Sequence, residues 1–114
     1  MTYKSTNGCM IGTCAASASY GKCFEVTDSL KGDIARSYFY LATAYWRSWE
    51  CCDELGVNGS DIKPWMENEM RDWHHGDPVD KNELSRNDAI YTLWQGNRNP
   101  FIDFPDWVDR ISDF

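Results

Sequence analysis

The sequence has no run of apolar residues approaching the roughly 20 that a membrane-spanning helix needs, so no membrane association is expected. Residues 1–20 contain one lysine and no long apolar stretch, and they do not resemble a secretory leader. We therefore expect either a protein that stays in the cell or one whose leader has been removed. Histidine is also scarce, because the chain has only two, His74 and His75.

Basic residues are in the minority as well. The chain has 11 Lys and Arg against 18 Asp and Glu, which gives a formal charge of −7. Residues 50–83 contain ten acids and three bases, so the whole net charge lies there. Because such a protein is repelled by phosphate backbones at long range, any contact with nucleic acid must use a local basic surface.

The number of cysteines in the chain is odd. With five of them, complete pairing within one chain is excluded. Cys14 and Cys23 could cross-link the N-terminal segment in an oxidising compartment, whereas the spacing of Cys9, Cys14 and Cys23 matches no common zinc pattern. Reduced, partly buried thiols are the default expectation. The five cysteines are Cys9, Cys14, Cys23, Cys51 and Cys52.

What the chain does have is enough apolar material for one small core. Its 114 residues are 42% hydrophobic and 15% aromatic, which fits a single folded domain. We predict a mainly α protein, with an irregular N-terminal arm over residues 1–22 and a helical domain over residues 23–114. The arm is rich in Gly, Ser, Thr, Ala and Asn, with room for a short hairpin, and a strand end is possible at residues 24–26.

The first helix is predicted to begin near Ser29 and to end by residues 55–56. An apolar stripe at helical spacing runs along it, so we expect Leu41 and Tyr45 to be buried and Leu41→Ala to cost about 2–5 kcal/mol. The stripe consists of Ile34, Tyr38, Leu41, Tyr45 and Trp49, and it is widened by Phe39, Ala42 and Trp46.

Three further helices are expected over residues 60–76, over residues 80–96 and from Pro105 onward. Asp80 and Glu83 are three positions apart and resemble a capping box, and residues 97–100 form a loop. The tryptophans of the apolar stripes should lie in the core, while Trp65 should be the most exposed. The predicted core tryptophans are Trp49, Trp73, Trp94 and Trp107.

Three segments go beyond a generic helical domain: KGDIARSYFYLAT at 31–43, WHHGDPVD at 73–80 and QGNRNPFID at 95–103. In this order and spacing they resemble the C-terminal, mostly helical part of endonuclease I–type bacterial nucleases, over roughly residues 20–111. The resemblance implies the helical part of a ββα-metal (His-Me finger) fold. It also implies magnesium-dependent, sequence-non-specific hydrolysis of DNA and RNA, in the periplasm or outside the cell.

The same resemblance implies a catalytic finger in which a histidine deprotonates water and a divalent ion stabilises the leaving oxygen. In the family those residues lie upstream in a Glu-His-x-x-Pro–like motif, which nothing before residue 20 matches. We expect a nuclease represented by its C-terminal part, with no catalytic residue and no metal ligand on this chain alone. The alternative is a non-catalytic binding or interaction module built on the same scaffold.

His74 and His75 could supply a general base, but a structural role at a helix end is favoured. Arg36, Arg86 and Arg98 are the candidate nucleic-acid contacts, because arginine binds phosphate through paired donors. A structural role is favoured over nucleic-acid binding for all three: an ion pair with an acid of the second helix for Arg36, and hydrogen bonds to loop carbonyls for Arg86 and Arg98.

The remaining motif residues are predicted to hold the helical scaffold together: Asp77, Asn87, Gln95, Asn97 and Asn99. Polar groups in the loop over residues 95–100 are costly to bury unpaired, and the apolar stripe of the first helix is wide. We therefore expect this surface to bind a catalytic partner segment or a second copy of the chain.

Overall fold

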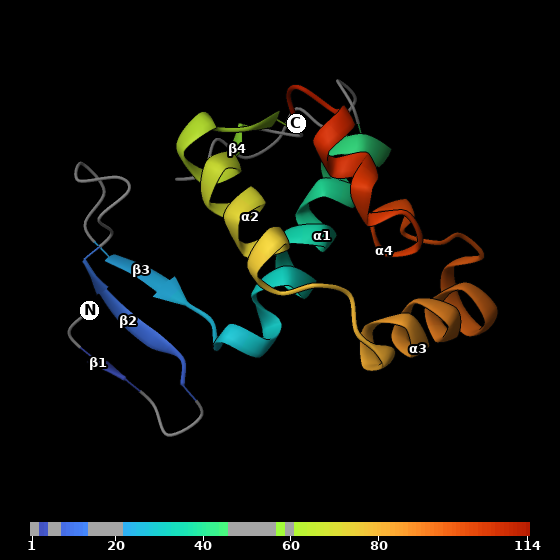
Figure 1. Cartoon of the computed structure of the whole chain (residues 1–114), viewed down its shortest axis with the longest axis horizontal. Helices are drawn as coiled ribbons and strands as arrows, with labels where there is room; N and C mark the ends of the chain where they lie inside the picture. Colours follow the sequence, from blue (N-terminus) through green and yellow to red (C-terminus); the bar gives the residue numbers. More distant parts are fainter. Residues whose placement is uncertain (1–2, 5–7, 14–21, 46–56, 59–60) are drawn as a thin grey trace.

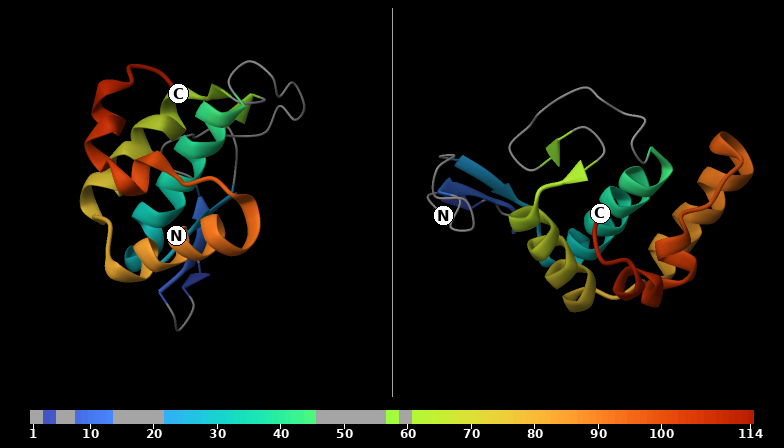
Figure 2. Two further views of the ribbon diagram at one scale, coloured as in Figure 1. Left: turned by 90° about the vertical axis from the view of Figure 1, so that its right-hand side faces the viewer. Right: turned by 90° about the horizontal axis from the view of Figure 1, so that it is seen from above.

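The structure is a computed structural model that describes residues 3–4, 8–13, 22–45, 57–58 and 61–114. It confirms a mainly α fold: helices pack around one core, and a small sheet stands beside them (Figures 1 and 2). In chain order the helical elements are α1 (Asp28–Ala44), α2 (Pro64–Gly76), α3 (Lys81–Ala89), the π-helix η1 (Ile90–Gln95), α4 (Pro100–Asp103) and the 3-10 helix η2 (Pro105–Arg110).

The N-terminal arm contains a small antiparallel sheet. Its strands are β1 (Tyr3–Lys4), β2 (Met10–Thr13) and β3 (Lys22–Glu25), in the order β1-β2-β3. The register pairs Ile11 with Phe24, so the strand expected near Phe24 is present. Cys23 is disulfide-bonded, so the default expectation of a reduced thiol is wrong at this position. The candidate partner Cys14 lies outside the described residues.

A second two-stranded sheet precedes α2. It joins β4 (Val57–Asn58) to β5 (Asp61–Ile62). The predicted helix start at residues 60–61 is therefore wrong, because Ile62 donates its N–H to the carbonyl of Phe114 at 2.8 Å and is held as a strand. The helix begins instead at Pro64, whose fixed φ and missing N–H suit a first helical turn.

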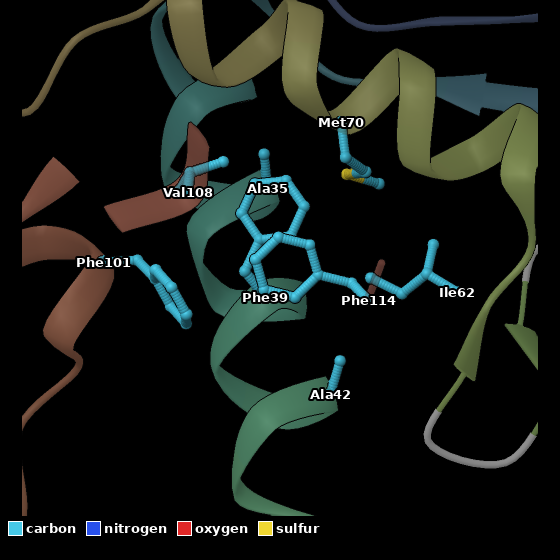
Figure 3. Packing of buried hydrophobic residues seen from close by; sticks show 8 residues of the cluster. All are labelled: Ala35, Phe39, Ala42, Ile62, Met70, Phe101, Val108 and Phe114. Carbon is cyan, nitrogen blue, oxygen red and sulfur yellow. The ribbon is translucent and has the colours of Figure 1, made fainter. Parts of the chain in front are cut away.

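The core lies where α1 faces α2, α4 and η2 (Figure 3). Phe39 stacks on Phe114 with ring centres 4.4 Å apart, and Phe101 meets both rings edge to face. The buried apolar residues are Ala35, Phe39, Ala42, Ile62, Met70, Phe101, Ile102, Val108 and Phe114.

The predicted stripe of α1 is wrong at two positions and correct at Phe39 and Ala42, and Ile34 and Tyr38 pack against the core partly buried. Leu41 is 38% exposed and Tyr45 is 47% exposed, whereas Ala35, Phe39 and Ala42 are buried. Because the two alanines are small, the backbone of α1 can lie close to the neighbouring helices on this face. Trp49, the last residue of the predicted stripe, lies outside the described residues.

The α3–η1 segment begins and ends as predicted. The Asp80 carboxylate accepts a hydrogen bond from the backbone N–H of Glu83 at 2.8 Å, and Gly96 follows the segment with φ +71°. The core assignment of Trp94 is wrong, because its side chain is 81% exposed. Trp107 is also exposed, whereas Trp65 and Trp73 are both partly buried.

Candidate functional site

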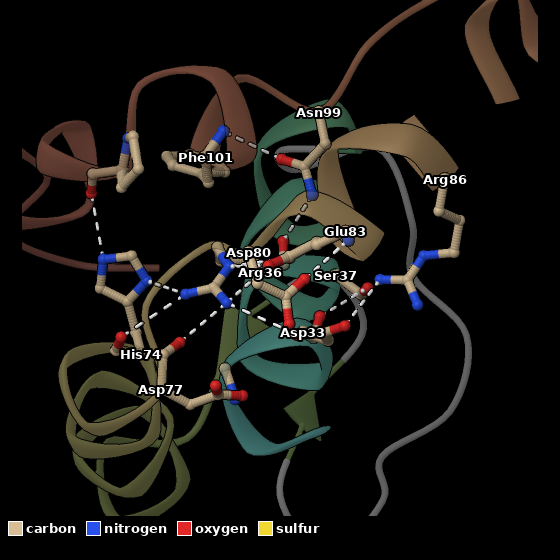
Figure 4. Close-up of polar contacts among 12 residues, drawn as sticks. Asp33, Arg36, Ser37, His74, Asp77, Asp80, Glu83, Arg86, Asn99 and Phe101 are labelled. Carbon is tan, nitrogen blue, oxygen red and sulfur yellow. Dashed lines mark hydrogen bonds and ion pairs between the residues drawn. The ribbon is translucent and has the colours of Figure 1, made fainter. Parts of the chain in front are cut away.

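A buried polar network lies where α1, α2 and α3 meet (Figure 4). Its centre is Arg36, whose side chain is fully buried. The Arg36 guanidinium donates to the carboxylate of Glu83, with Nε–Oε2 at 2.8 Å and Nη2–Oε1 at 2.6 Å. Glu83 is also fully buried. Two opposite charges removed from water in this way require each other, because either alone would be strongly destabilising.

Arg36 also holds the C-terminal end of α2. Its Nη2 donates to the carbonyl of Asp77 at 2.9 Å, and its Nη1 lies 3.5 Å from the carbonyl of His74. Carbonyls at a helix C-terminus lack partners within the helix, and a cation there is favourable. One arginine therefore ties α1 to the end of α2 and to α3.

His74 belongs to the same network. Its Nδ1 lies 3.0 Å from Arg36 Nη1 and its Nε2 lies 3.0 Å from the carbonyl of Pro105. Because a guanidinium only donates and a carbonyl only accepts, the ring must accept at Nδ1 and donate at Nε2. Burial lowers the pKa of His74, and the Arg36 charge lowers it further. Both ring nitrogens serve the fold, which favours the structural alternative over a general base. His75 is exposed and pairs with Asp109 at 3.0 Å.

Gly32, the second residue of the KGD segment, lies where a larger residue would not fit. Its backbone N–H donates to the Asp77 carboxylate at 2.9 Å. A Cβ on Gly32 would collide with the carbonyl of Asp77 and would lie 2.6 Å from Arg36 Nη2. The first two motifs thus meet at a contact that only glycine permits.

The third motif folds around two asparagines. Asn87 is buried, and its Oδ1 accepts from the backbone N–H of Asn99 at 3.0 Å. The Asn99 side chain donates to the carbonyl of Arg36 and accepts from the N–H of Phe101, both at 3.0 Å. Asn99 thereby caps α4, which begins inside the predicted loop. Gln95 and Asn97 lie at the exposed end of η1.

The two remaining arginines lie nearer the surface. Arg98 pairs with Asp88 at 2.6 Å and with Asp103 at 2.9 Å, and its hydrogen bonds to Asp103, together with its charge, hold the pKa of Asp103 below the usual value. Arg86 is 48% exposed and lies 3.4 Å from the Asp33 carboxylate. Of the three arginines considered for nucleic acid, the geometry leaves Arg86 the most accessible and favours the structural alternative for Arg36.

Asp33 completes the network and was missed by sequence reasoning. It is buried, and burial raises its pKa, with the nearby negative charge of Glu83 as the second cause. Its Oδ1 has no hydrogen-bond donor within the described part of the chain, and the Arg36 guanidinium lies 3.6 Å away. The residue sits beside Arg36 on α1, so its polarity alone suggested a solvent-facing position. Glu83 was recognised only as part of a cap, although its carboxylate points at Arg36.

Over the described residues, no three His, Cys, Asp or Glu side chains are arranged to hold a metal ion. The same ranges contain no helix long and apolar enough to cross a membrane. The acids closest to one another, Asp33, Asp77 and Glu83, instead surround the hydrogen-bonding groups of Arg36 and Gly32 (Figure 4). The arrangement is therefore a polar junction between α1, α2 and α3, in which these three acids lie around the two bases Arg36 and Arg86.

Comparison with known proteins places this junction in a family. The Endonuclease I family profile matches residues 1–106. The chain is similar to an extracellular ribonuclease of Bacillus subtilis (strain 168), with 42% identity over 96 residues, and to one of Bacillus amyloliquefaciens, with 43% identity over 96 residues. Each match covers 80% of this chain and 33% of the relative, so the chain spans about a third of the curated relatives' length. No solved structure matches. The profile match covers nearly the whole chain, and the chain therefore belongs to the Endonuclease I family.

Proposed function

We propose that this chain is the helical scaffold of an Endonuclease I nuclease that hydrolyses phosphodiester bonds of RNA and DNA. The observation that carries the proposal is the Arg36 junction. Each of the three sequence segments that resemble the family contributes to it, through Arg36, His74 and Asn99. Buried hydrogen bonds and ion pairs of this kind hold helices in a fixed arrangement, which is what a catalytic segment needs from its support.

The contacts of His74 support a scaffold role for this residue in place of catalysis. A general base must be free to take a proton from water. His74 is buried with both nitrogens bonded, and its lowered pKa reflects that burial. The proposal therefore assigns the catalytic histidine of the family to a segment outside this chain.

Magnesium is the ion that the family resemblance implies. Over the described residues, no three His, Cys, Asp or Glu side chains lie together as ligands. We assign no ligand role to them. When bound elsewhere in the nuclease, the ion would supply charge stabilisation for the leaving oxygen.

The relatives' names point to RNA as a substrate and to a location outside the cell. The disulfide at Cys23 supports the same location, because disulfides persist in oxidising compartments. A chain with a net charge of −7 gains no general attraction to phosphate, so we propose that the substrate is held by local groups.

A chimera tests this function. The matched segment of the Bacillus subtilis extracellular ribonuclease is replaced by the corresponding segment of this chain, and cleavage of RNA and plasmid DNA is measured with magnesium and with EDTA. We expect magnesium-dependent cleavage that Arg36→Met abolishes by loosening the junction and that Arg110→Met leaves intact. Arg110 is the control because its pair with Asp106 is exposed on both sides. A chimera that folds by circular dichroism but cleaves neither substrate would overturn the proposal.

A further inference from the structure

The α3–η1 segment carries large apolar side chains that the fold leaves in solvent. Leu93 is 69% exposed and Trp94 is 81% exposed, and Leu84 and Tyr91 are exposed as well. Figures 1 and 2 show this segment on the opposite side of the molecule from the β1–β3 sheet. Exposure of this much apolar surface to water is unfavourable, and exposed apolar patches are typical of binding surfaces.

The backbone of this segment is unusual too. After nine α-helical residues, the chain continues as a π-helix over Ile90–Gln95 and ends at Gly96 with positive φ. Short π-helical turns are rare and occur frequently at functional sites. Here the wider turns carry Tyr91 and Trp94, the two exposed aromatic residues of the segment.

The charge of this surface differs from that of the segments before and after it in the sequence. Residues 81–103 contain three bases and three acids, which gives 3 − 3 = 0. One of those acids, Glu83, is buried against Arg36 and does not face solvent. Residues 61–80 contain two bases and six acids, which gives 2 − 6 = −4, and residues 104–114 contain one base and three acids, which gives 1 − 3 = −2. A polyanion can therefore approach α3–η1 more readily than its acidic neighbours.

One cationic group of this surface lies beside an aromatic ring. The Arg98 guanidinium lies over the Tyr91 ring, 5.6 Å from its centre, and is fixed there by Asp88 and Asp103. Arg86 has one ion pair among the described contacts, at 3.4 Å from Asp33, and is half exposed. Flat rings next to cations match single-stranded nucleic acid, whose bases stack on aromatic faces while its phosphates contact basic groups.

We propose that α3–η1 binds a single-stranded stretch of the nucleic acid substrate, with Trp94 stacking on a base and Arg86 contacting a phosphate. This inference rests on the proposed nuclease function and names how the scaffold would hold the strand. Single strands are favoured over duplexes because stacking on a side chain requires an unpaired, accessible base. Stacking is tolerant of sequence, as a non-specific nuclease requires.

The test is fluorescence anisotropy of a labelled oligouridine titrated with the 114-residue chain in EDTA at low ionic strength. Losing one base stack corresponds to about 1–3 kcal/mol, so Trp94→Ala should weaken binding by about 5- to 150-fold. Trp94→Phe should retain most of the affinity, because phenylalanine also stacks. Arg86→Ala should lower the slope of log K against log salt by about 0.7, the value for one phosphate of a single strand.

Trp107→Ala is the matched control. Trp107 is exposed and stacks on Phe104, but it lies on η2 beside Asp106 and Asp109. Its loss should leave oligouridine binding unchanged. Thermal melts of each variant confirm the fold, which Trp94→Ala should preserve because the side chain packs against little.

The inference is overturned if the unaltered chain does not bind oligouridine, or if Trp94→Ala binds as tightly as the unaltered chain does. It is also overturned if sedimentation shows self-association that Trp94→Ala removes while RNA binding is unchanged, because the surface would then join protein copies. The proposed function is tested separately by cleavage. A chimera that cleaves RNA equally well with Trp94→Ala would refute this inference and leave the nuclease proposal standing.

Discussion

The pair formed by Arg36 and Glu83 makes the strongest stability prediction. Both side chains are fully buried and are joined by hydrogen bonds of 2.6, 2.8 and 3.0 Å. Removing one partner of a buried pair leaves an uncompensated charge, which costs about 3–5 kcal/mol. Arg36→Met should therefore lower the free energy of unfolding by that amount. For a chain of this size the melting temperature should fall by about 10–30 °C.

A double-mutant cycle measures the interaction between Arg36 and Glu83 apart from the contacts that each makes with other residues. Glu83→Leu alone should be as damaging as Arg36→Met, whereas the double variant should recover part of the loss because no buried charge is left unpaired. Recovery should be incomplete, since Arg36 also donates to the carbonyl of Asp77. Urea unfolding monitored by circular dichroism measures all four proteins. Arg110→Met is the control and should cost at most about 0.5 kcal/mol, because its ion pair is exposed.

Two results would refute this reasoning. If Arg36→Met unfolds with the free energy of the unaltered chain, the arginine does not hold the junction. If the loss of unfolding free energy in the double variant equals the sum of the losses in the two single variants, Arg36 and Glu83 do not interact.

Further predictions concern single positions. Leu41→Ala should cost about 1 kcal/mol or less in urea unfolding, because this side chain is partly exposed. Gly32→Ala should cost about 1–3 kcal/mol or more by forcing a methyl group into the Asp77 carbonyl, and a silent substitution would contradict the close approach. Asp80→Ala should cost about 0.5–2 kcal/mol through loss of the cap on α3. Because burial lowers the pKa of His74, the unfolded chain binds a proton that the folded chain rejects. The stabilisation linked to neutral His74 is fully present above the unfolded pKa of about 6.5. It is lost as pH falls toward the lower pKa that His74 has in the folded chain. In the His74→Gln variant the free energy of unfolding should therefore change less between about pH 7 and pH 5. An unchanged slope of unfolding free energy against pH would refute the assignment.

Local signals in the sequence predicted local structure well. The carboxylate of Asp80 and the backbone of Glu83 form the expected cap, and Gly96 ends the following segment. Both signals act within a few residues, so tertiary context rarely overrides them. The start of α2 was misjudged because Ile62 bonds to Phe114, a partner 52 positions away (114 − 62) that no local pattern reveals.

The inward face of α1 was also hidden. Apolar spacing favoured Leu41 and Tyr45, but packing chose the face with Ala35, Arg36 and Phe39. An arginine at the centre of a buried face becomes predictable only when its partner is known, and Glu83 lies 47 positions along the chain. Motif resemblance identified the segments that meet at the junction, whereas their hydrogen bonds required the folded arrangement.

The measurement that tests the central claim most directly is nuclease activity of the 114-residue chain by itself. The claim is that the described residues support the catalytic chemistry of the nuclease without performing it. Cleavage of RNA and plasmid DNA is followed with magnesium, manganese and calcium, and with EDTA as the blank. We predict no robust metal-dependent cleavage, and no difference between the unaltered chain and His74→Ala. Robust metal-dependent cleavage that His74→Ala abolishes would contradict the account.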